Sequence, residues 1–422
     1  MLINIDTMDV GKIIFNLRNE RGLTQEELSE GICSISYLSK LEHNQIKYSD
    51  EILSLLFQKL NVDENKLYTK HKNFNDNVSN LSKFIDMKNY TDTENCYSEL
   101  NNLVNEIKDP NSICNYHITK LKYFLAKRNL ESARTTIDYI NEFFKRKSVR
   151  QEALFIDLCG VYFSIKGNFV EGLKFFKDAE RIALENNLNV ANIFYHLGLT
   201  YSQIHNDTLA IHYAQNALKL FESDMNYLKC IDCQLIISLK FVRNQNFRSA
   251  EKIYFDILEQ AKIFTLPKTK AITLHNLGFL YYKVKDYNQS VNYFVEALEY
   301  KSPKNEDYIL SIYYLCNALM EDDRNKEVIF WLNKALHYIE KNEHLKEYKY
   351  SYMVKLYKYK YEDFDKYIEF AENVVFPYLI SIKTKELILS VGNLLIEYYN
   401  SKHRYKRSNN FYKIMLEFME VN

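Results

Sequence analysis

One pattern of small and large residues recurs along most of this 422-residue chain and restricts its fold more than any other feature. In residues 271–303 the pattern consists of Leu274, Leu277, Gly278, Tyr281, Ser290, Phe294 and Ala297. Residues 191–217 repeat it as Phe194, Leu197, Gly198, Tyr201, Ala210, Ala214 and Ala217, and residues 153–179 as Ile156, Cys159, Gly160, Phe163, Gly172, Phe176 and Ala179. Small residues at fixed spacing let two helices approach closely, while large ones fill the gap to the next pair. The pattern therefore predicts a series of helical hairpins.

The spacing of these positions is that of the tetratricopeptide repeat. The position of Gly278 recurs at Leu81, Leu121, Gly160, Gly198, Ser238, Cys316, about Val354, and Gly392. We therefore predict an all-α fold in which residues 81–422 form a right-handed solenoid of about nine hairpins, with a period of roughly 38 to 40 residues. The first two hairpins and the eighth depart from the pattern. The eighth, rich in Lys and Tyr, is expected to mark a bend or a contact surface.

Composition agrees with a helical array. Only 9 Gly and 4 Pro occur, and these are the residues on which loops and tight turns depend. The 35 Tyr and 26 Phe are expected to pack between helices. We find no run of about 18 apolar residues and no basic start followed by an apolar stretch, so we expect no membrane span, no signal peptide and a cytoplasmic protein.

The sequence contains none of the common catalytic motifs that we looked for. Phosphate-binding glycine loops, nucleophile elbows and zinc-protease motifs are absent, and the ten His do not cluster at ligand spacing. Cys230 and Cys233 form a CxxC without a second pair at zinc spacing, so the seven Cys are interpreted as reduced, packed thiols. We predict no catalytic residue, no metal and no cofactor.

Residues 11–44 contain the start and stop signals of three short helices. Gly22 would end the first helix in a left-handed conformation, and Thr24 with Glu27 forms a capping box for a second helix from Gln25 to Glu30. Ser34 is a cap for the third helix, and Asn44 stands where a left-handed residue would end it. This arrangement is typical of a helix-turn-helix of the lambda-repressor type, which we assign to residues 1–66.

DNA binding by this segment would depend on local placement, because residues 1–70 carry 8 Lys+Arg against 11 Asp+Glu, a net charge of −3. Lys12, Arg18, Arg21, Lys40 and Lys47 would have to face phosphates or bases. The predicted DNA contacts are Gln25, Ser34, Ser36, Tyr37, Lys40, Asn44 and Lys47, of which Ser36, Tyr37 and Lys40 are the recognition-helix candidates. The alternative is a protein-binding relic of a helix-turn-helix.

A polar, Asn-rich segment at residues 61–80 joins the two parts and is expected to be a linker helix or a hinge. We take residues 67–80 as the linker and residues 81–422 as the repeat domain. A change in the repeats could pass through this segment to a pair of DNA-binding heads.

The segment GLTQEELSEGICSISYLSKLE, followed by nine long hairpins, resembles the RNPP family of peptide-sensing regulators of Gram-positive bacteria, and in length it is most similar to the NprR-like members. The resemblance covers the whole chain. It implies a quorum-sensing transcriptional regulator that binds a short, secreted and re-imported oligopeptide on the concave face of its repeats and then alters its binding to promoter DNA. It also implies a homodimer or higher oligomer.

The repeats themselves suggest where a peptide would lie. Polar side chains six and three positions before the glycine position, and one after it, should face inward, where amides and charges can satisfy a peptide backbone. The predicted peptide contacts are Asn115, Lys122, Asp157, Asn192, Tyr195, Asp232, His275, Asn276 and Asn317. Lys122 could meet a peptide carboxylate, and Asp157 or Asp232 an amine. Gln234 lies beside this stripe, and Asn393 continues it in the last repeat.

Two other functions stay open. Rap proteins of the same family bind or dephosphorylate response regulators, and such a partner is possible here as a second activity. A phage or mobile-element repressor would use the same modules. The peptide, the operator and the sign of regulation do not follow from the sequence.

Overall fold

The computed structural model describes residues 8–420, and within them the chain consists of helices joined by turns. The predicted all-α fold is confirmed. Residues 1–7 and 421–422, the outer ends of the two predicted domains, lie outside the described residues. The chain forms two compact units, residues 1–236 and residues 237–422, whose boundary falls inside one helix. Within residues 8–420, no helix is both long and apolar enough to cross a bilayer.

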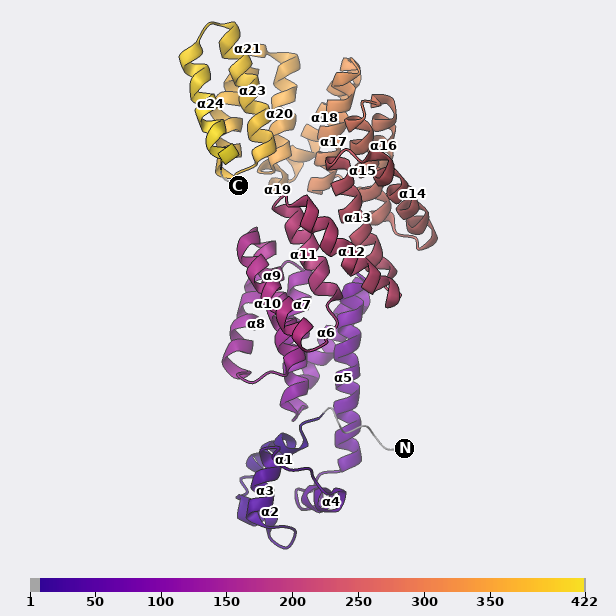
Figure 1. The fold of residues 1–422 in the computed structure, drawn as a ribbon, viewed down its shortest axis with the longest axis vertical. Coiled ribbons are helices and arrows are strands. Elements are labelled where there is room, and N and C mark those ends of the chain that lie inside the picture. Colours follow the sequence, from indigo (N-terminus) through magenta and orange to yellow (C-terminus); the bar gives the residue numbers. More distant parts are fainter. Residues whose placement is uncertain (1–7, 421–422) are drawn as a thin grey trace. The chain divides into compact units, whose positions relative to one another are not determined.

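Four short helices form a separate module at one end of a long helix, as Figure 1 shows. They are α1 (Val10–Glu20), α2 (Gln25–Ser29), α3 (Ile35–Glu42) and α4 (Asp50–Lys59), and we call them the head. The predicted signals are confirmed: Gly22 has a φ of 66°, Thr24 and Glu27 form the capping box, Ser34 caps α3, and Asn44 has a φ of 56°. The core of the head includes the expected apolar residues, Ile13, Ile14, Leu17, Leu38 and Leu41, all buried.

The segment after the head is one continuous helix, α5 (Glu64–Asp86). Of the two forms left open by the sequence, a linker helix or a hinge, the structure has the helix. Tyr68 packs into the head core, whereas Phe74, Val78 and Leu81 belong to the core of the first repeat. The predicted boundaries at residues 66 and 80 thus fall inside α5, and they remain proposals.

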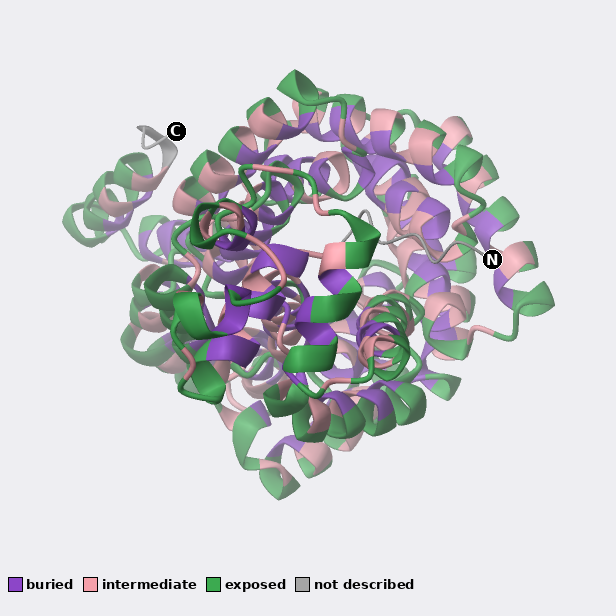
Figure 2. Cartoon of the chain, turned by 90° about the horizontal axis from the view of Figure 1, so that it is seen from below, coloured by how far each residue is buried: buried purple, intermediate pink, exposed green. Residues whose placement is uncertain are grey.

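The remaining helices form nine pairs among the described residues, the number expected. The first helices of the pairs are α5, α7 (Pro110–Ala126), α9 (Val149–Ile165), α11 (Ala191–Gln203), α13 (Tyr227–Arg243), α15 (Pro267–Lys283), α17 (Glu306–Glu321), α20 (Lys349–Glu362) and α23 (Lys385–Ser401). Their partners are α6 (Tyr90–Leu103), α8 (Leu130–Phe143), α10 (Phe169–Glu185), α12 (Asp207–Ser223), α14 (Phe247–Ile263), α16 (Tyr287–Glu299), α18 (Asn325–Lys341), a broken helix, and α24 (Tyr405–Glu420). Figure 2 shows that the buried residues follow the sides of helices that face a neighbour.

The two helices of a pair touch where the sequence repeats its small residues. A Cβ on Gly278 would lie 2.8 Å from the ring of Phe294, and one on Gly160 would lie 2.6 Å from the ring of Phe176. Ser290 Oγ donates to the carbonyl oxygen of Gly278 at 2.8 Å. The glycine position is therefore small because the second helix lies directly against its backbone.

The eighth pair has a broken second helix. It consists of α21 (Phe364–Phe370), a π-helical turn over Ala371–Val375, and α22 (Phe376–Ser381), and a short helix, α19 (Glu343–Lys346), precedes the pair. Pro377 accounts for part of the break, since proline cannot donate the backbone hydrogen bond that a continuous helix needs. The expected irregularity of this repeat is thus a distortion of its second helix.

We expect Gly278→Ala to destabilise the second unit by about 1–2 kcal/mol. Overpacking against the fully buried Phe294 costs about 1–3 kcal/mol and exceeds the helix propensity that alanine gains. Denaturant unfolding of the full chain measures the change. Asn393→Ala, at an exposed site on α23, is the control, and Gly278→Ala combined with Phe294→Leu should recover stability. A single variant as stable as the native chain would contradict the packing account.

Candidate functional site

The outer face of α3 carries the polar side chains expected of a recognition helix. Ser36 and Lys40 are exposed there, and Lys47 is exposed in the loop that follows. Arg21 is exposed at the end of α1, while Lys12 is half-buried with its ammonium 5.0 Å from the ring centroid of Phe15. These groups can reach a nucleic-acid backbone without any change in the head.

Four of the predicted DNA contacts have structural partners inside the head, and three of them are Ser34, Tyr37 and Asn44. The hydroxyl of Tyr37 accepts a hydrogen bond from the Ser49 backbone N–H at 3.3 Å, and Ser34 Oγ accepts from the N–H of Tyr37 at 3.1 Å. Asn44 Nδ2 donates to Asp9 Oδ1 at 2.6 Å, which joins the end of α3 to the start of α1. Tyr37 is only half-buried, but its hydroxyl is turned toward the head, so Ser36 and Lys40 remain the freest candidates.

Arg18 does not face a ligand, contrary to the expectation that it would be aimed at DNA. Its guanidinium is buried and forms two contacts with Glu42, at 2.6 and 3.0 Å, while Nη1 donates to the Leu23 carbonyl at 2.8 Å. Gln25 Nε2 donates to the same carboxylate at 2.7 Å. The sequence could not distinguish this buried pair from surface charges, because both residues sit beside core positions. The phosphate role of Gln25 stays a prediction, although its amide already has this partner.

The head is also joined to the loop before α7. The ammonium of Lys108 pairs with Glu20, the Lys108 carbonyl accepts from Asn16 Nδ2 at 2.9 Å, and buried Asp109 accepts from the N–H of Asp9 at 3.2 Å. These contacts supplement α5, so two separate connections set the orientation of the head on the first repeat.

A cavity of about 430 Å³ lies in the first unit, and we call it the first-unit cavity. Its wall includes three of the predicted peptide contacts, Lys122, Asp157 and Asn192. They come from α7, α9 and α11, the first helices of successive pairs. Three residues that the sequence predicts as peptide contacts thus lie at one site, and their role in binding remains a prediction.

Several charges in this cavity have partners within the chain. Lys122 Nζ lies 2.6 Å from Asp86 and donates to Ser82 Oγ at 2.8 Å, and burial lowers the pKa of this lysine against the opposing effect of Asp86. His196 Nδ1 lies 2.8 Å from Asp157. Lys88 pairs with Asp232 at 3.3 Å, linking the end of the first hairpin turn to α13.

Two cations of the wall are left without a carboxylate within 4 Å among the described residues, Arg150 and Lys229. Lys229 rests 4.4 Å from the ring centroid of Tyr195, another predicted contact. The sequence did not predict either cation as a peptide contact, because the inward-facing positions were counted back only to the sixth residue before the glycine position. Arg150 and Lys229 lie one helical turn further toward the N-terminus on the same helix face, so a longer stripe would have included them.

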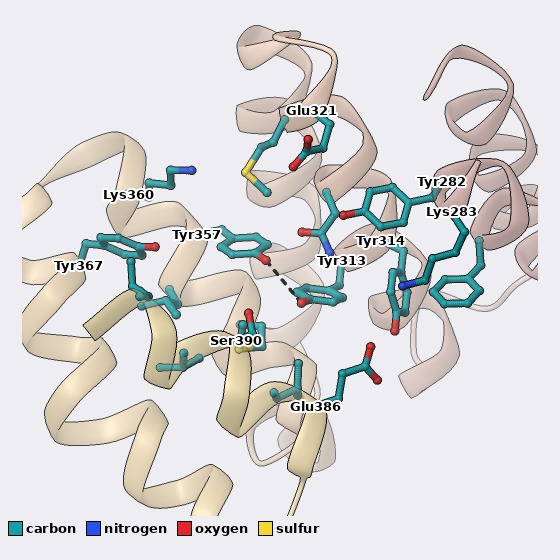
Figure 3. Close-up of a pocket in the computed structure, with 18 residues that line it drawn as sticks. Tyr282, Lys283, Tyr313, Tyr314, Glu321, Tyr357, Lys360, Tyr367, Glu386 and Ser390 are labelled. Carbon is teal, nitrogen blue, oxygen red and sulfur yellow. Dashed lines mark hydrogen bonds between the residues drawn. The ribbon is translucent and has the colours of Figure 1, made fainter. Parts of the chain in front are cut away.

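The other predicted peptide contacts lie outside this cavity. Asn115 accepts from Gln151 Nε2 at 2.9 Å and bridges neighbouring repeats, although it is exposed. His275 Nδ1 lies 2.9 Å from Ser311 Oγ, and burial lowers its pKa well below the usual value. Asn276 is half-buried on the same helix. Asn317 lines a different pocket in the second unit, shown in Figure 3, which we call the tyrosine pocket.

The cysteines pack as the sequence predicts. All seven are free, and Cys230 and Cys233 of the CxxC are buried on α13. Burial raises the pKa of their thiols to about 11 and about 12. Thiols held this strongly in the protonated form are poor nucleophiles and poor metal ligands.

Two family models match the chain where the structure has the corresponding elements. A helix-turn-helix model matches residues 14–67, and a tetratricopeptide-repeat model matches residues 271–303. The transcriptional activator NprA of Geobacillus stearothermophilus is 22% identical over 402 residues, which cover 93% of this chain and 99% of NprA. Over nearly its whole length, the chain is similar to this regulator of the RNPP family.

Structures of RNPP regulators share its fold. The apo form of the quorum sensor NprR from B. thuringiensis is 23% identical, with a TM-score of 0.71 over 83% of this chain and 99% of that chain. NprR in complex with its cognate peptide NprX is also 23% identical, with a TM-score of 0.62 over 81% and 97%. Response regulator aspartate phosphatase I of Bacillus subtilis is 19% identical over 329 residues, 75% of this chain and 82% of its own.

We expect Glu42→Gln to destabilise the head by about 3–5 kcal/mol, because the guanidinium of Arg18 would remain buried without its counter-charge. Hydrogen exchange of residues 10–60 measures the loss locally. The double variant Arg18→Met with Glu42→Met removes both charges and should recover most of the protection. Unchanged exchange in the single variant would mean that the pair is not needed.

Proposed function

We propose that this chain is a quorum-sensing transcriptional regulator whose head binds promoter DNA and whose first-unit cavity binds a short signalling peptide. The observation that carries the proposal is the combination of an exposed polar face on α3 with a cavity that retains two unpaired cations on the same compact unit. The match to NprA over nearly the whole length and the peptide complex of NprR support it. The protein would act in the cytoplasm, where both ligands can meet it.

The chemistry of the cavity suits an extended peptide. The amide of Asn192 can donate to and accept from a peptide backbone, and the apolar wall residues Leu125, Leu154 and Val161 can cover its side chains. The lining carries four Lys or Arg against two Asp, Asp86 and Asp157. A ligand with a free carboxylate therefore fits better than a cationic one. Arg150 and Lys229 replace Lys122 as the proposed carboxylate contacts, since Lys122 is already paired.

Helix α5 provides a route from peptide to DNA. Ser82 and Asp86, near its end, line the cavity, and Tyr68, near its start, packs in the head core. A peptide that binds in the cavity beside Ser82 and Asp86 would shift α5 and with it the head. In a dimer such a shift would change the separation of two recognition helices, which must match about one turn of DNA or a multiple.

A response regulator is a second candidate partner. The match to response regulator aspartate phosphatase I over three quarters of the chain favours it. Incubation with phosphorylated response regulators of the host tests this activity: faster loss of phosphate would add it, and an unchanged half-life would exclude it for the regulators assayed.

We expect Ser36→Ala and Lys40→Ala each to weaken binding to the selected DNA sequence by about 1–3 kcal/mol, the range for a side chain that contacts a base or phosphate. The operator can be selected from random DNA with the native protein. Both side chains are exposed, so the melting temperature should not change. Lys174→Ala, an exposed lysine on α10, is the control. If the native protein and the three variants bound this DNA with equal affinity, α3 would not enter a groove of the DNA.

We expect Arg150→Gln and Lys229→Met each to weaken peptide binding about tenfold, since each removes one charge-assisted contact. The ligands are synthetic peptides from the tail of a small reading frame beside the gene. Each peptide is compared with a version in which its carboxylates are amides. Calorimetry should give weaker binding for the amide with the native chain and no such difference with the double variant. Lys174→Ala again serves as the control, and a peptide that binds all variants equally would place its site elsewhere.

A further inference from the structure

The tyrosine pocket in the second unit is a separate site with a different lining. Its volume is about 360 Å³, and its aromatic wall consists of Phe279 and Tyr282 from α15, Tyr313 and Tyr314 from α17, Tyr357 from α20, and Tyr367 from α21. Two exposed carboxylates, Glu321 and Glu386, stand at its edge on different helices. Figure 3 shows the tyrosine rings gathered between these two glutamates.

Elsewhere this chain combines tyrosine and glutamate in a recurring way. Lys270 Nζ lies 4.3 Å from the ring centroid of Tyr300 and 3.0 Å from Glu296. The same arrangement of a cation over a tyrosine ring beside a glutamate occurs in three more sets: Lys127, Tyr123 and Glu94; Lys177, Tyr213 and Glu180; and Arg407, Tyr399 and Glu372. The face of an aromatic ring attracts a cation, and the carboxylate adds an ion pair.

The tyrosine pocket has the rings and the carboxylates of this arrangement, but neither lysine of its lining is paired with Glu321 or Glu386. Among the described residues, no Lys or Arg lies within 4 Å of Glu321 or Glu386. Of the two lysines of the lining, Lys283 lies over Phe279 of the aromatic wall, 5.1 Å from its ring centroid, and Lys360 is exposed. Lys349, outside the lining, rests over Tyr350 at 5.4 Å, and burial lowers its pKa against the opposing effect of Glu386.

Burial and the two carboxylates together raise the pKa of tyrosine hydroxyls in the wall. Burial raises the pKa of Tyr282 to about 12, and Glu321 adds to this shift. Burial likewise raises the pKa of Tyr313 and Tyr314, with a further contribution from Glu386. The two carboxylates thus act on the phenols of the wall in the direction that favours a positive charge beside them.

We propose that the tyrosine pocket binds an organic cation, an ammonium or guanidinium group carried by a ligand, with Glu386 and Glu321 as counter-charges and the tyrosine rings as walls. This site is independent of the peptide site proposed for the first unit. The cation can come from a lysine or arginine side chain of a peptide, or from a free small amine.

Pairs of probes that differ only in charge test the proposal on the full chain. Nα-acetyl-lysine amide is compared with its neutral counterpart Nα-acetyl-norleucine amide, and choline with 3,3-dimethylbutan-1-ol. Calorimetry and saturation-transfer NMR should give tighter binding of the charged member, by about fivefold or more. A preference for the lysine amide indicates a peptide side chain, and a preference for choline indicates a free amine.

Variants assign the binding to this pocket. Glu386→Gln should reduce the affinity for the charged probe at least threefold and leave the neutral probe unchanged. Glu397→Gln, exposed on the same helix but outside the lining, is the matched control. Tyr357→Phe keeps the aromatic ring and should keep binding, whereas Tyr357→Leu should lose it. Circular dichroism checks that each variant is folded.

Three results would overturn the proposal. Equal affinity for the two members of each pair, or no binding of either charged probe, would remove the role of charge. Tighter binding of Nα-acetyl-glutamate amide than of the lysine amide would mean that Lys283 and Lys360 determine the specificity. Equal loss of binding in Glu386→Gln and Glu397→Gln would locate the probe away from the pocket.

Discussion

The close approach of the two helices in each hairpin is the constraint on which the rest of the structure depends. Where Gly278 meets Phe294 and Gly160 meets Phe176, the helices are too near for even a methyl group on the glycine. Because a helix repeats every 3.6 residues, fixing this one contact also fixes which other residues face the core, the next hairpin and the inner surface. The positions of Lys122, Asp157 and Asn192 in one cavity follow from it.

Close packing also fixes the connection between the head and the repeats. A 23-residue helix is stable in water chiefly through its packing, and α5 packs at both ends, with Tyr68 in one core and Phe74, Val78 and Leu81 in the next. The Lys108–Glu20 pair and the contact of Asp109 with the backbone of Asp9 add a second connection. A displacement of the first repeat can therefore move the head with it, because both connections consist of packed or hydrogen-bonded residues.

The sequence predicted best the features that depend on interactions between residues close together in the chain. The caps at Thr24 and Ser34, the left-handed Asn44 and the nine hairpins depend on short-range rules, and all are present. Prediction was weakest for charged residues. Arg18 is buried against Glu42, and Lys122 is paired with Asp86, because partners 24 and 36 positions away in the chain cannot be read from spacing alone. The free cations Arg150 and Lys229 were missed for a different reason, since they lie one helical turn before the first position that was counted as facing inward.

Ion pairing within the chain determines which charges at the two pockets remain available to a ligand. An unpaired charge held close to apolar surface is costly, so most close-packed charges in this chain have a partner, as Arg18 has Glu42 and Lys122 has Asp86. Where a charge at a pocket wall lacks one, a ligand of opposite charge gains an ion pair without first breaking an internal contact. In the proposed sites, Arg150 and Lys229 would favour an anionic group, while Glu321 and Glu386, beside tyrosine rings, would favour a cationic one. The two proposed sites would therefore select for opposite charge, and a single small ion could not satisfy both.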